Sequence, residues 1–192
     1  MPAPEPTRTT YAAYLEAEQR SEMKHEYLRG EVYAMAGGTP EHAALSMAVG
    51  AALTAALAGR PCRVFSSDLR IRVESTDLST YPDLTVICGS FEHAAADPNA
   101  ATNPTLIVEV LSDSTEAYDR GEKFAHYRRI PSLREYLLVS QREPRLEAYR
   151  KNATGEWVLS EAGAGELLSL ASLEGVRLDT DAIYRDPLAA GG

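Results

Sequence analysis

Two carboxylates stand in parts of the chain where apolar surroundings are expected. Asp83 follows Pro82 and opens a short apolar run, and Glu109 interrupts a second apolar run over 106–111. An ionised carboxylate inside a sheet core is costly unless it is paired or bound to a metal. If the two runs are neighbouring strands, the two carboxylates could share a divalent cation. Oxygen ligands suit Mg²⁺ or Mn²⁺, and such an ion activates water and stabilises charge on a scissile phosphate.

A lysine on the next predicted helix could complete this chemistry. Lys123 shares one helical face with Asp119 and Tyr127, because the three recur at intervals of four residues. From there it could orient water or neutralise a phosphate at the end of the Glu109 strand. The same spacing also fits an Asp119–Lys123 ion pair on a solvated face, which would contribute little. Asp83 could equally start a turn after proline, and Glu109 could pair with a core arginine or lie at an edge.

Two further candidates lie nearer the N-terminus. Glu26 falls in a predicted hairpin, where a third carboxylate could complete or support a metal site. Taken alone, it also fits a strand glutamate that faces solvent. His42 begins a predicted helix after Pro40 and could contact phosphate or act as an acid, although a histidine at a helix start often has no such role.

Basic residues form two groups on this acidic chain. Either group could contact phosphate, and a solvated helix face explains the first group about as well. The first group is Arg120, Lys123, His126, Arg128, Arg129 and Arg134, and the second is Arg60, Arg63, Arg70 and Arg72.

Composition narrows the class of protein. The 192 residues suffice for one domain, and 44% hydrophobic and 24% charged residues are ordinary for a globular protein. A net charge of −9 argues against a general nucleic-acid binder, but not against an enzyme whose cation reverses the charge of an acidic centre. The sequence shows neither an apolar run long enough to span a membrane nor a signal peptide. Because Cys62 and Cys88 form no Cys-x-x-Cys pair, we expect reduced cysteines, no zinc site and a cytoplasmic protein.

The elements that must position these residues follow from turn and capping signals. We expect a disordered segment over 1–9 and a single domain over 10–186. A surface loop is expected near 97–104, and Asp113 or Ser114 is expected to cap the third helix. Helices are predicted at 11–19, 40–58 and 115–129, a hairpin around Arg29-Gly30, and strands at 63–66, 69–74, 83–88, 105–111, 135–140, 146–150 and 157–160. This order predicts a mixed sheet flanked by helices, in the α/β or α+β class.

Taken together, the motifs resemble a known family. Pro82-Asp83, Glu109-Val-Leu-Ser112, Asp119-x-x-x-Lys123-x-x-x-Tyr127 and Glu135-Tyr-Leu-Leu-Val139 occur in the order seen in the Uma family of restriction endonuclease-like proteins. That family belongs to the PD-(D/E)XK nuclease superfamily. The segment His25-Glu26-Tyr-Leu-Arg-Gly30, with Met35 and His42, is similar too, so the resemblance covers roughly residues 10–150.

The resemblance implies a restriction-endonuclease-like central mixed sheet with flanking helices. It also implies a metal site, with Mg²⁺ (or Mn²⁺) held by Asp83, Glu109, the carbonyl of Val110 and Glu26. The superfamily's lysine is expected two residues after Glu109, where this chain has Leu111.

In the resembling family that lysine lies on the next helix, which implies Lys123 here, with His42 and Tyr127 in support. The predicted function is hydrolysis of DNA phosphodiester bonds by a metal-dependent endonuclease. A homodimer is expected, because nucleases of this superfamily often act as dimers. Two alternatives stay open: an inactive module of the same fold that binds DNA or a protein partner, and a hydrolase of smaller phosphate esters.

Overall fold

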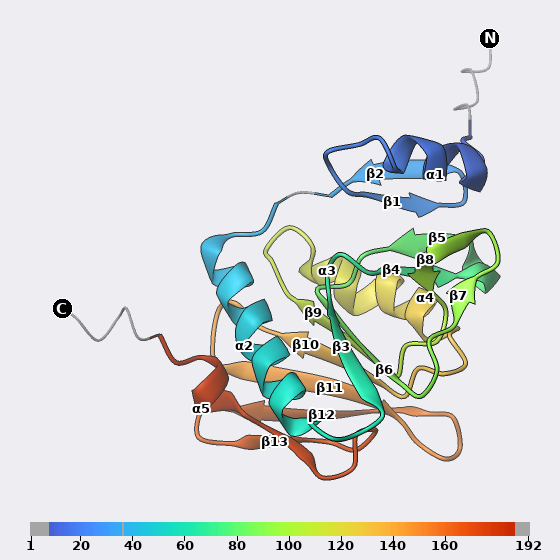
Figure 1. Ribbon diagram of the computed structural model, residues 1–192. Coiled ribbons are helices and arrows are strands. Elements are labelled where there is room, and N and C mark those ends of the chain that lie inside the picture. The colour runs from blue at the N-terminus through green and yellow to red at the C-terminus, as the bar shows by residue number, and fades with distance from the viewer. Residues whose placement is uncertain (1–7, 36, 187–192) are drawn as a thin grey trace.

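A computed structural model describes residues 8–35 and 37–186 of the chain (Figure 1). Helices and strands are interleaved along the sequence, so the α+β class predicted from the element order is confirmed. The helical elements are α1 (Tyr11–Glu18), α2 (Pro40–Ala56), the 3₁₀ turn η1 (Glu74–Thr76), α3 (Glu116–Tyr118), the π-helical turn η2 (Asp119–Lys123), α4 (Phe124–Tyr127) and α5 (Thr180–Ile183).

Two six-stranded sheets carry most of the structure, where one mixed sheet was predicted. The N-terminal sheet has the order β2 (Glu31–Ala34), β1 (His25–Leu28), β5 (Leu78–Thr80), β4 (Arg70–Val73), β8 (Asp97–Ala101), β7 (His93–Ala94). The central sheet has the order β12 (Trp157–Gly163), β11 (Arg145–Lys151), β10 (Glu135–Val139), β9 (Leu106–Val110), β6 (Leu84–Cys88), β3 (Cys62–Ser66). A two-stranded sheet joins β13 (Leu167–Leu170) to β14 (Val176–Asp179).

Both large sheets are mixed. β9 and β10 run parallel in the central sheet, as do β4 and β8 in the N-terminal sheet, and the other pairs are antiparallel. The prediction of a surface loop near 97–104 is wrong over 97–101, because those residues form β8 and pair with β4. That pairing extends the N-terminal sheet.

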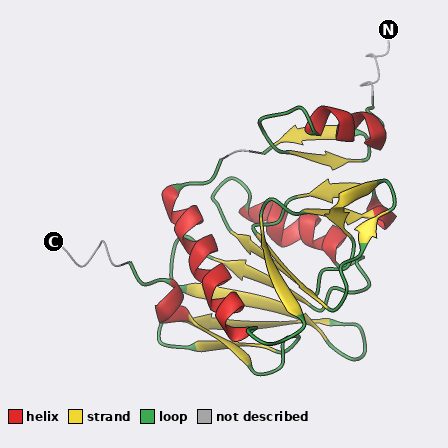
Figure 2. Cartoon of the chain, in the orientation of Figure 1, coloured by secondary structure: helices red, strands yellow, loops and turns green. Residues whose placement is uncertain are grey.

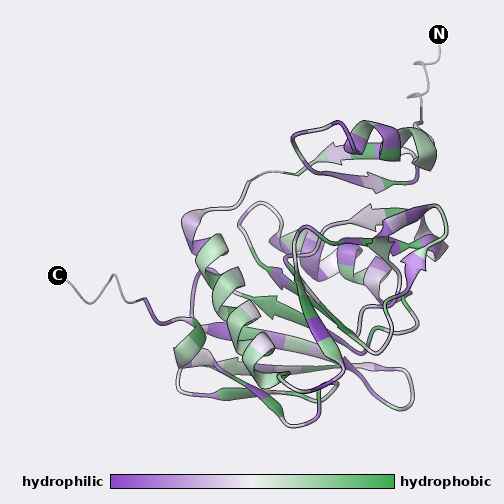
Figure 3. Ribbon diagram, in the orientation of Figure 1, coloured by the Kyte–Doolittle hydropathy of each residue, from purple (hydrophilic) through white to green (hydrophobic). Residues whose placement is uncertain are grey.

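Helices cover both faces of the central sheet (Figure 2). Leu45, Val49 and Leu53 of α2 pack on one face, in a cluster with Leu106 and Val108. On the other face, Phe124 and Tyr127 of α4 pack with Ile107, Tyr136 and residues of the N-terminal sheet. The strands between these layers are largely hydrophobic (Figure 3). Because side chains alternate along a strand, Glu109 points to the same face as Ile107, towards η2 and α4.

The first two helices each begin after a threonine that caps them. Thr10 and Thr39 cap α1 and α2, accepting hydrogen bonds from the backbone N–H groups of Ala13 and His42 at 3.2 and 3.1 Å. The third helix differs from its prediction, because neither Asp113 nor Ser114 caps it. The Ser112 hydroxyl accepts the hydrogen bond from Thr115 N instead, at 3.2 Å.

The third helix also has an irregular interior. Its middle turn, η2, is π-helical, with α-helical turns before and after it. The carbonyl of Asp119, at the start of this turn, accepts a hydrogen bond from the Tyr136 hydroxyl at 3.1 Å. π-turns are rare and occur frequently at functional sites.

The predicted hairpin at Arg29-Gly30 is confirmed. Both residues have positive φ, 50° and 91°, as the tight turn between β1 and β2 requires. Most of the predicted disordered segment 1–9 lies outside the described residues. Thr9, which is described, donates a backbone hydrogen bond to Gly30 at 2.8 Å.

The prediction of reduced cysteines is wrong, because Cys62 and Cys88 form a disulfide. They face each other across the antiparallel β3–β6 pair, with Cα atoms 4.0 Å apart. The backbone bond from Gly89 N to Pro61 O flanks them, so they form the closely spaced, non-hydrogen-bonded type of pair. Most cytosols keep thiols reduced, so the predicted cytoplasmic location loses the support drawn from cysteine usage.

Within the described ranges, no helix is long and apolar enough to cross a membrane.

Candidate active site

Asp83 and Glu109 meet across two neighbouring strands. β6 and β9 are paired antiparallel with Leu84 opposite Val108, so one residue further along Asp83 stands opposite Glu109. The Asp83 Oδ2 atom accepts a hydrogen bond from the backbone N–H of Val110 at 2.7 Å. The expectation that the two apolar runs are adjacent strands is therefore confirmed.

Glu109 is held from the helix above it. The residue is 4% exposed, and its Oε1 atom lies 2.9 Å from Lys123 Nζ. The same oxygen accepts a hydrogen bond from the Tyr127 hydroxyl at 2.8 Å. The four-residue spacing of Lys123 and Tyr127 thus lets one helical face deliver both side chains to one carboxylate.

Lys123 contacts two further carboxylates. Its Nζ atom lies 3.4 Å from Glu26 Oε1 and 3.4 Å from Asp119 Oδ1. Lys123 is only 5% exposed, so the reading of Asp119–Lys123 as a pair on a solvated face is wrong. The reading of Glu26 as a solvent-facing strand residue is also wrong, because its side chain is largely buried and accepts a hydrogen bond from the Thr80 hydroxyl of β5.

His42 reaches the site from the first turn of α2. Its Nε2 atom lies 3.2 Å from Asp83 Oδ2, and this hydrogen bond raises the pKa of the imidazole, although burial opposes the shift. The carbonyl of Val110, implied as a metal ligand, adds to the raised pKa. Gly38 leaves room for the ring, because a Cβ atom there would stand 2.8 Å from His42 Nδ1.

The site has more acids than bases. Three carboxylates, those of Glu26, Glu109 and Asp119, surround Lys123. The fourth, that of Asp83, stands opposite Glu109 with His42 beside it. Burial raises the pKa of Glu109 to about 8; Asp83 and Asp119 add to the shift and Lys123 opposes it.

The lysine stays charged in this setting. Burial by itself would lower the pKa of Lys123, but Glu109, Glu26 and Asp119 together raise it well above its ordinary value. Burial also raises the pKa of Asp119, against the effect of Lys123. The excess negative charge is what a divalent cation would offset, and the donors are the oxygen ligands that Mg²⁺ prefers.

In the geometry of the described residues, no three His, Cys, Asp or Glu side chains converge as a metal-binding group. Lys123 lies between the carboxylates that would otherwise approach one another.

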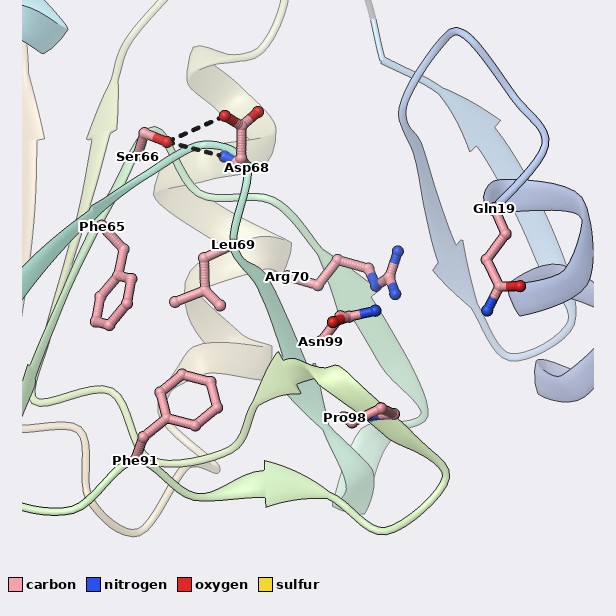
Figure 4. A pocket seen from close by; sticks show the side chains of 9 residues that line it. All are labelled: Gln19, Phe65, Ser66, Asp68, Leu69, Arg70, Phe91, Pro98 and Asn99. Carbon is pink, nitrogen blue, oxygen red and sulfur yellow. Dashed lines mark hydrogen bonds between the residues drawn. The ribbon is translucent and has the colours of Figure 1, made fainter.

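These groups border a cavity of about 360 Å³. Its walls come from β2, the start of α2, the segment after β9, and the helix that carries Lys123. A larger hollow of about 590 Å³ lies elsewhere (Figure 4). Phe65, Leu69 and Phe91 line it, and its charged residues are committed to other partners, Asp68 to Lys24 at 2.6 Å and Arg70 to Asp97 at 2.9 Å. The smaller cavity is therefore the one suited to chemistry.

Several arginines from the predicted basic groups serve the fold. Arg70 is buried against Asp97, and Arg72 pairs with Asp77 and lies 3.9 Å over the ring of Tyr11. Arg120 bonds Glu147 and Glu116. These three arginines are each paired with a carboxylate of the fold.

The structure adds residues that sequence reasoning left out of the site. Asp119 was noted only for its spacing, and its position four residues before Lys123 was the signal that could have found it. Thr80 and Tyr33 gave no such signal, because their place in the site depends on how the N-terminal sheet packs against the helix. Tyr118 directly precedes Asp119 on the helix and was also left out.

The fold matches that of a solved nuclease-like structure. A crystal structure described as a putative nuclease belonging to DUF820, from Anabaena variabilis ATCC 29413, superposes with a TM-score of 0.73. The match covers 90% of this chain and 95% of that one at 17% sequence identity, so the likeness concerns the fold. The predicted restriction-endonuclease-like fold is thereby confirmed.

The chain belongs to the Uma2 family, whose model, described as "Putative restriction endonuclease", matches residues 11–181. Two proteins of Synechocystis sp. (strain PCC 6803) are similar over most of their length. The uncharacterized protein slr1290 is 40% identical over 172 residues, covering 90% of this chain and 89% of that protein. The uncharacterized protein sll1609 is 36% identical over 152 residues, covering 79% and 86%. The resemblance noted in the sequence is confirmed.

Proposed function

We propose that the chain is a metal-dependent DNA endonuclease that hydrolyses phosphodiester bonds in the cavity beside Lys123. One observation carries the proposal: a single buried ammonium group pairs with three carboxylates, and a fourth carboxylate, that of Asp83, borders the same cavity. Purely structural ion pairs tend to balance their charges. Excess buried acid is costly, and a cation offsets that cost.

The metal would be held by Asp83, Glu109 and the carbonyl of Val110, with Glu26 supporting the site from β1. When bound, Mg²⁺ or Mn²⁺ would supply a nucleophilic water at neutral pH and neutralise phosphate charge. Tyr127 and His42 position the two acids, since one hydrogen-bonds Glu109 and the other Asp83.

Lys123 acts as a fixed positive charge in this proposal. Because its raised pKa keeps the amine protonated, it serves poorly as a base and well as a donor to developing phosphate charge. Glu26, Glu109 and Asp119 hold the ammonium group in place before substrate arrives.

The test is cleavage of supercoiled and linear DNA with Mg²⁺ or Mn²⁺, comparing the native chain with Asp83→Ala. The matched control is Asp68→Ala, which removes an exposed carboxylate outside the cavity. We expect cleavage by the native chain and the control, and loss of cleavage in Asp83→Ala. Cleavage that persists in Asp83→Ala would refute the assignment, and absence of cleavage by the native chain would favour the inactive module.

A further inference from the structure

Three tyrosines line the cavity. The hydroxyl of Tyr81 is held by Arg70 and Glu18, and the other two tyrosines come from different elements. Tyr33 comes from β2 and Tyr118 from α3, and both line the cavity that contains Lys123. The Lys123 ammonium lies 5.9 Å from the centroid of the Tyr118 ring. The hydrogen bond to Glu31 is the main cause of the raised pKa of Tyr33, and burial is the main cause of that of Tyr118. The carboxylate of Glu122 adds to both shifts, so both rings lie near the helix turn that carries it.

Neither ring is used to build the core. Most aromatic residues of the chain pack against another ring, but in the described part of the chain Tyr33 and Tyr118 make no ring–ring contact. Tyr33 is 48% exposed on a strand whose four residues are all exposed, and its hydroxyl bonds Glu31 of the same strand. An exposed aromatic ring at the edge of an acidic cavity adds little to folding.

The depth of the charged groups limits what can reach them. Glu109 and Lys123 are nearly inaccessible from bulk solvent, and they adjoin a cavity of only about 360 Å³. A duplex holds its phosphates on the outside of a rod much wider than such a cavity. A single strand is narrower and more flexible than a duplex, so its phosphate can approach Lys123 more easily than one fixed on that rod.

The cavity wall has aromatic rings but few basic side chains that could bind a nucleic-acid backbone. Among the described residues that line it, Lys123 is the one lysine and there is no arginine. Proteins that bind single strands combine electrostatic contacts with aromatic rings on which bases stack. With so little positive charge here, stacking must supply much of the affinity.

We propose that Tyr33 and Tyr118 form a nucleobase subsite, which holds the base next to the scissile phosphate outside the duplex. The substrate is accordingly single-stranded DNA, or DNA with an unpaired segment, in preference to intact duplex. The cleavage test of this inference rests on the proposed nuclease function. The test of base binding does not depend on it.

The first experiment measures binding of a single-stranded oligonucleotide that contains 2-aminopurine, whose fluorescence is quenched by stacking. Calcium replaces magnesium so that binding is observed without turnover. We expect quenching by the native chain and about a tenfold or greater loss of affinity in Tyr33→Ala and Tyr118→Ala. Tyr118→Phe keeps the ring and should bind like the native chain.

The matched control is Phe91→Ala, which removes another exposed ring (43% exposed) at the hollow of Figure 4. It should leave binding unchanged. Because Tyr33 is exposed, Tyr33→Ala should fold normally, which thermal melting checks. Equal affinity in Tyr33→Ala, Tyr118→Ala and the native chain would overturn the subsite.

The second experiment compares cleavage of one sequence as a single strand, a bubble and a blunt duplex. We expect the unpaired substrates to be cut about tenfold faster or more. Equal cutting of intact duplex would overturn the inference while the nuclease function stands. Base quenching lost in Tyr33→Ala and Tyr118→Ala, without cleavage of any substrate, would keep the subsite and reject the nuclease function.

Discussion

Two buried charged clusters in this molecule differ in how their charges are balanced. In the N-terminal cluster, Arg70 donates to both carboxylate oxygens of Asp97, at 2.9 and 3.0 Å, and to the Tyr81 hydroxyl at 2.8 Å. Tyr81 in turn donates to Glu18, which also accepts the backbone N–H of His25. Each acid in this cluster has a basic partner, and the hydrogen bonds form a closed network.

The active-site cluster has the opposite character. Glu109, Glu26 and Asp119 share one ammonium group, and Asp83 relies on His42 and a backbone N–H. In the first cluster the charged groups pair with one another and hold α1 and β4 in place. The second keeps unbalanced negative charge next to a cavity, which is a state suited to receiving a cation and a phosphate.

The largest expected effect is on the balanced cluster. Arg70→Ala should destabilise the fold by about 3–5 kcal/mol, because Asp97 would stay buried without its partner. Chemical denaturation measures the change. The double variant Arg70→Met/Asp97→Leu should recover most of the lost stability. A loss that remains would show that the ion pair stabilises the fold by more than the cost of burying its two charges.

The next effect concerns activity at the unbalanced cluster. Lys123→Ala should lower the cleavage rate about 10²–10³-fold, because the developing phosphate charge loses its fixed partner. Single-turnover cleavage measures the rate, and Lys24→Ala, which removes a lysine outside the cavity, is the control. A rate within a few-fold of the native chain would remove Lys123 from the chemistry.

A pH dependence follows from Glu109. Burial raises its pKa from 4.5 to about 8, so between these values the folded chain holds a proton that the unfolded chain has released. The free energy of unfolding contributed by this group therefore falls as pH rises from about 4.5 to 8. Denaturation across this range should show the decline in the native chain and a flatter profile in Glu109→Gln. Identical profiles would contradict the raised pKa of Glu109.

The smallest effect concerns the position of His42. Gly38→Ala places a Cβ atom against the imidazole and should shift it by a few tenths of an ångström from Asp83. We expect cleavage to fall about tenfold or less, with little change in melting temperature. Gly37→Ala is the control, since its Cβ would meet no atom within 4 Å. Equal rates in the two variants would show that the His42–Asp83 contact does not matter for turnover.

The parts of the fold that were predictable depend on local signals. Each of these signals lies within a few consecutive residues. They are the caps at Thr10 and Thr39, the Arg29-Gly30 turn and the apolar strand segments. The adjacency of Asp83 and Glu109 was predictable as well, because buried carboxylates at the ends of two apolar runs favour a shared site.

The parts that sequence reasoning missed depend on contacts between distant segments. β8 forms because it pairs with β4 and because Asp97 meets Arg70, and neither contact is visible from a Pro- and Asn-containing stretch. The disulfide joins cysteines 26 residues apart, and only the β3–β6 register brings them together. The metal ligands, the homodimer and the single domain over 10–186 stay predictions.

The π-helical turn η2 is the place where the helix holds an extra residue. Its hydrogen bonds run from residue i to residue i+5, so the turn contains one residue more than an α-helical turn. Deletion of one codon among 120–122 would therefore leave an ordinary α-helical turn and keep the parts of the helix before and after it in phase. Deletion of one codon among 124–126 would instead turn Tyr127 by about 100° relative to Lys123, so that the two side chains could no longer meet on Glu109.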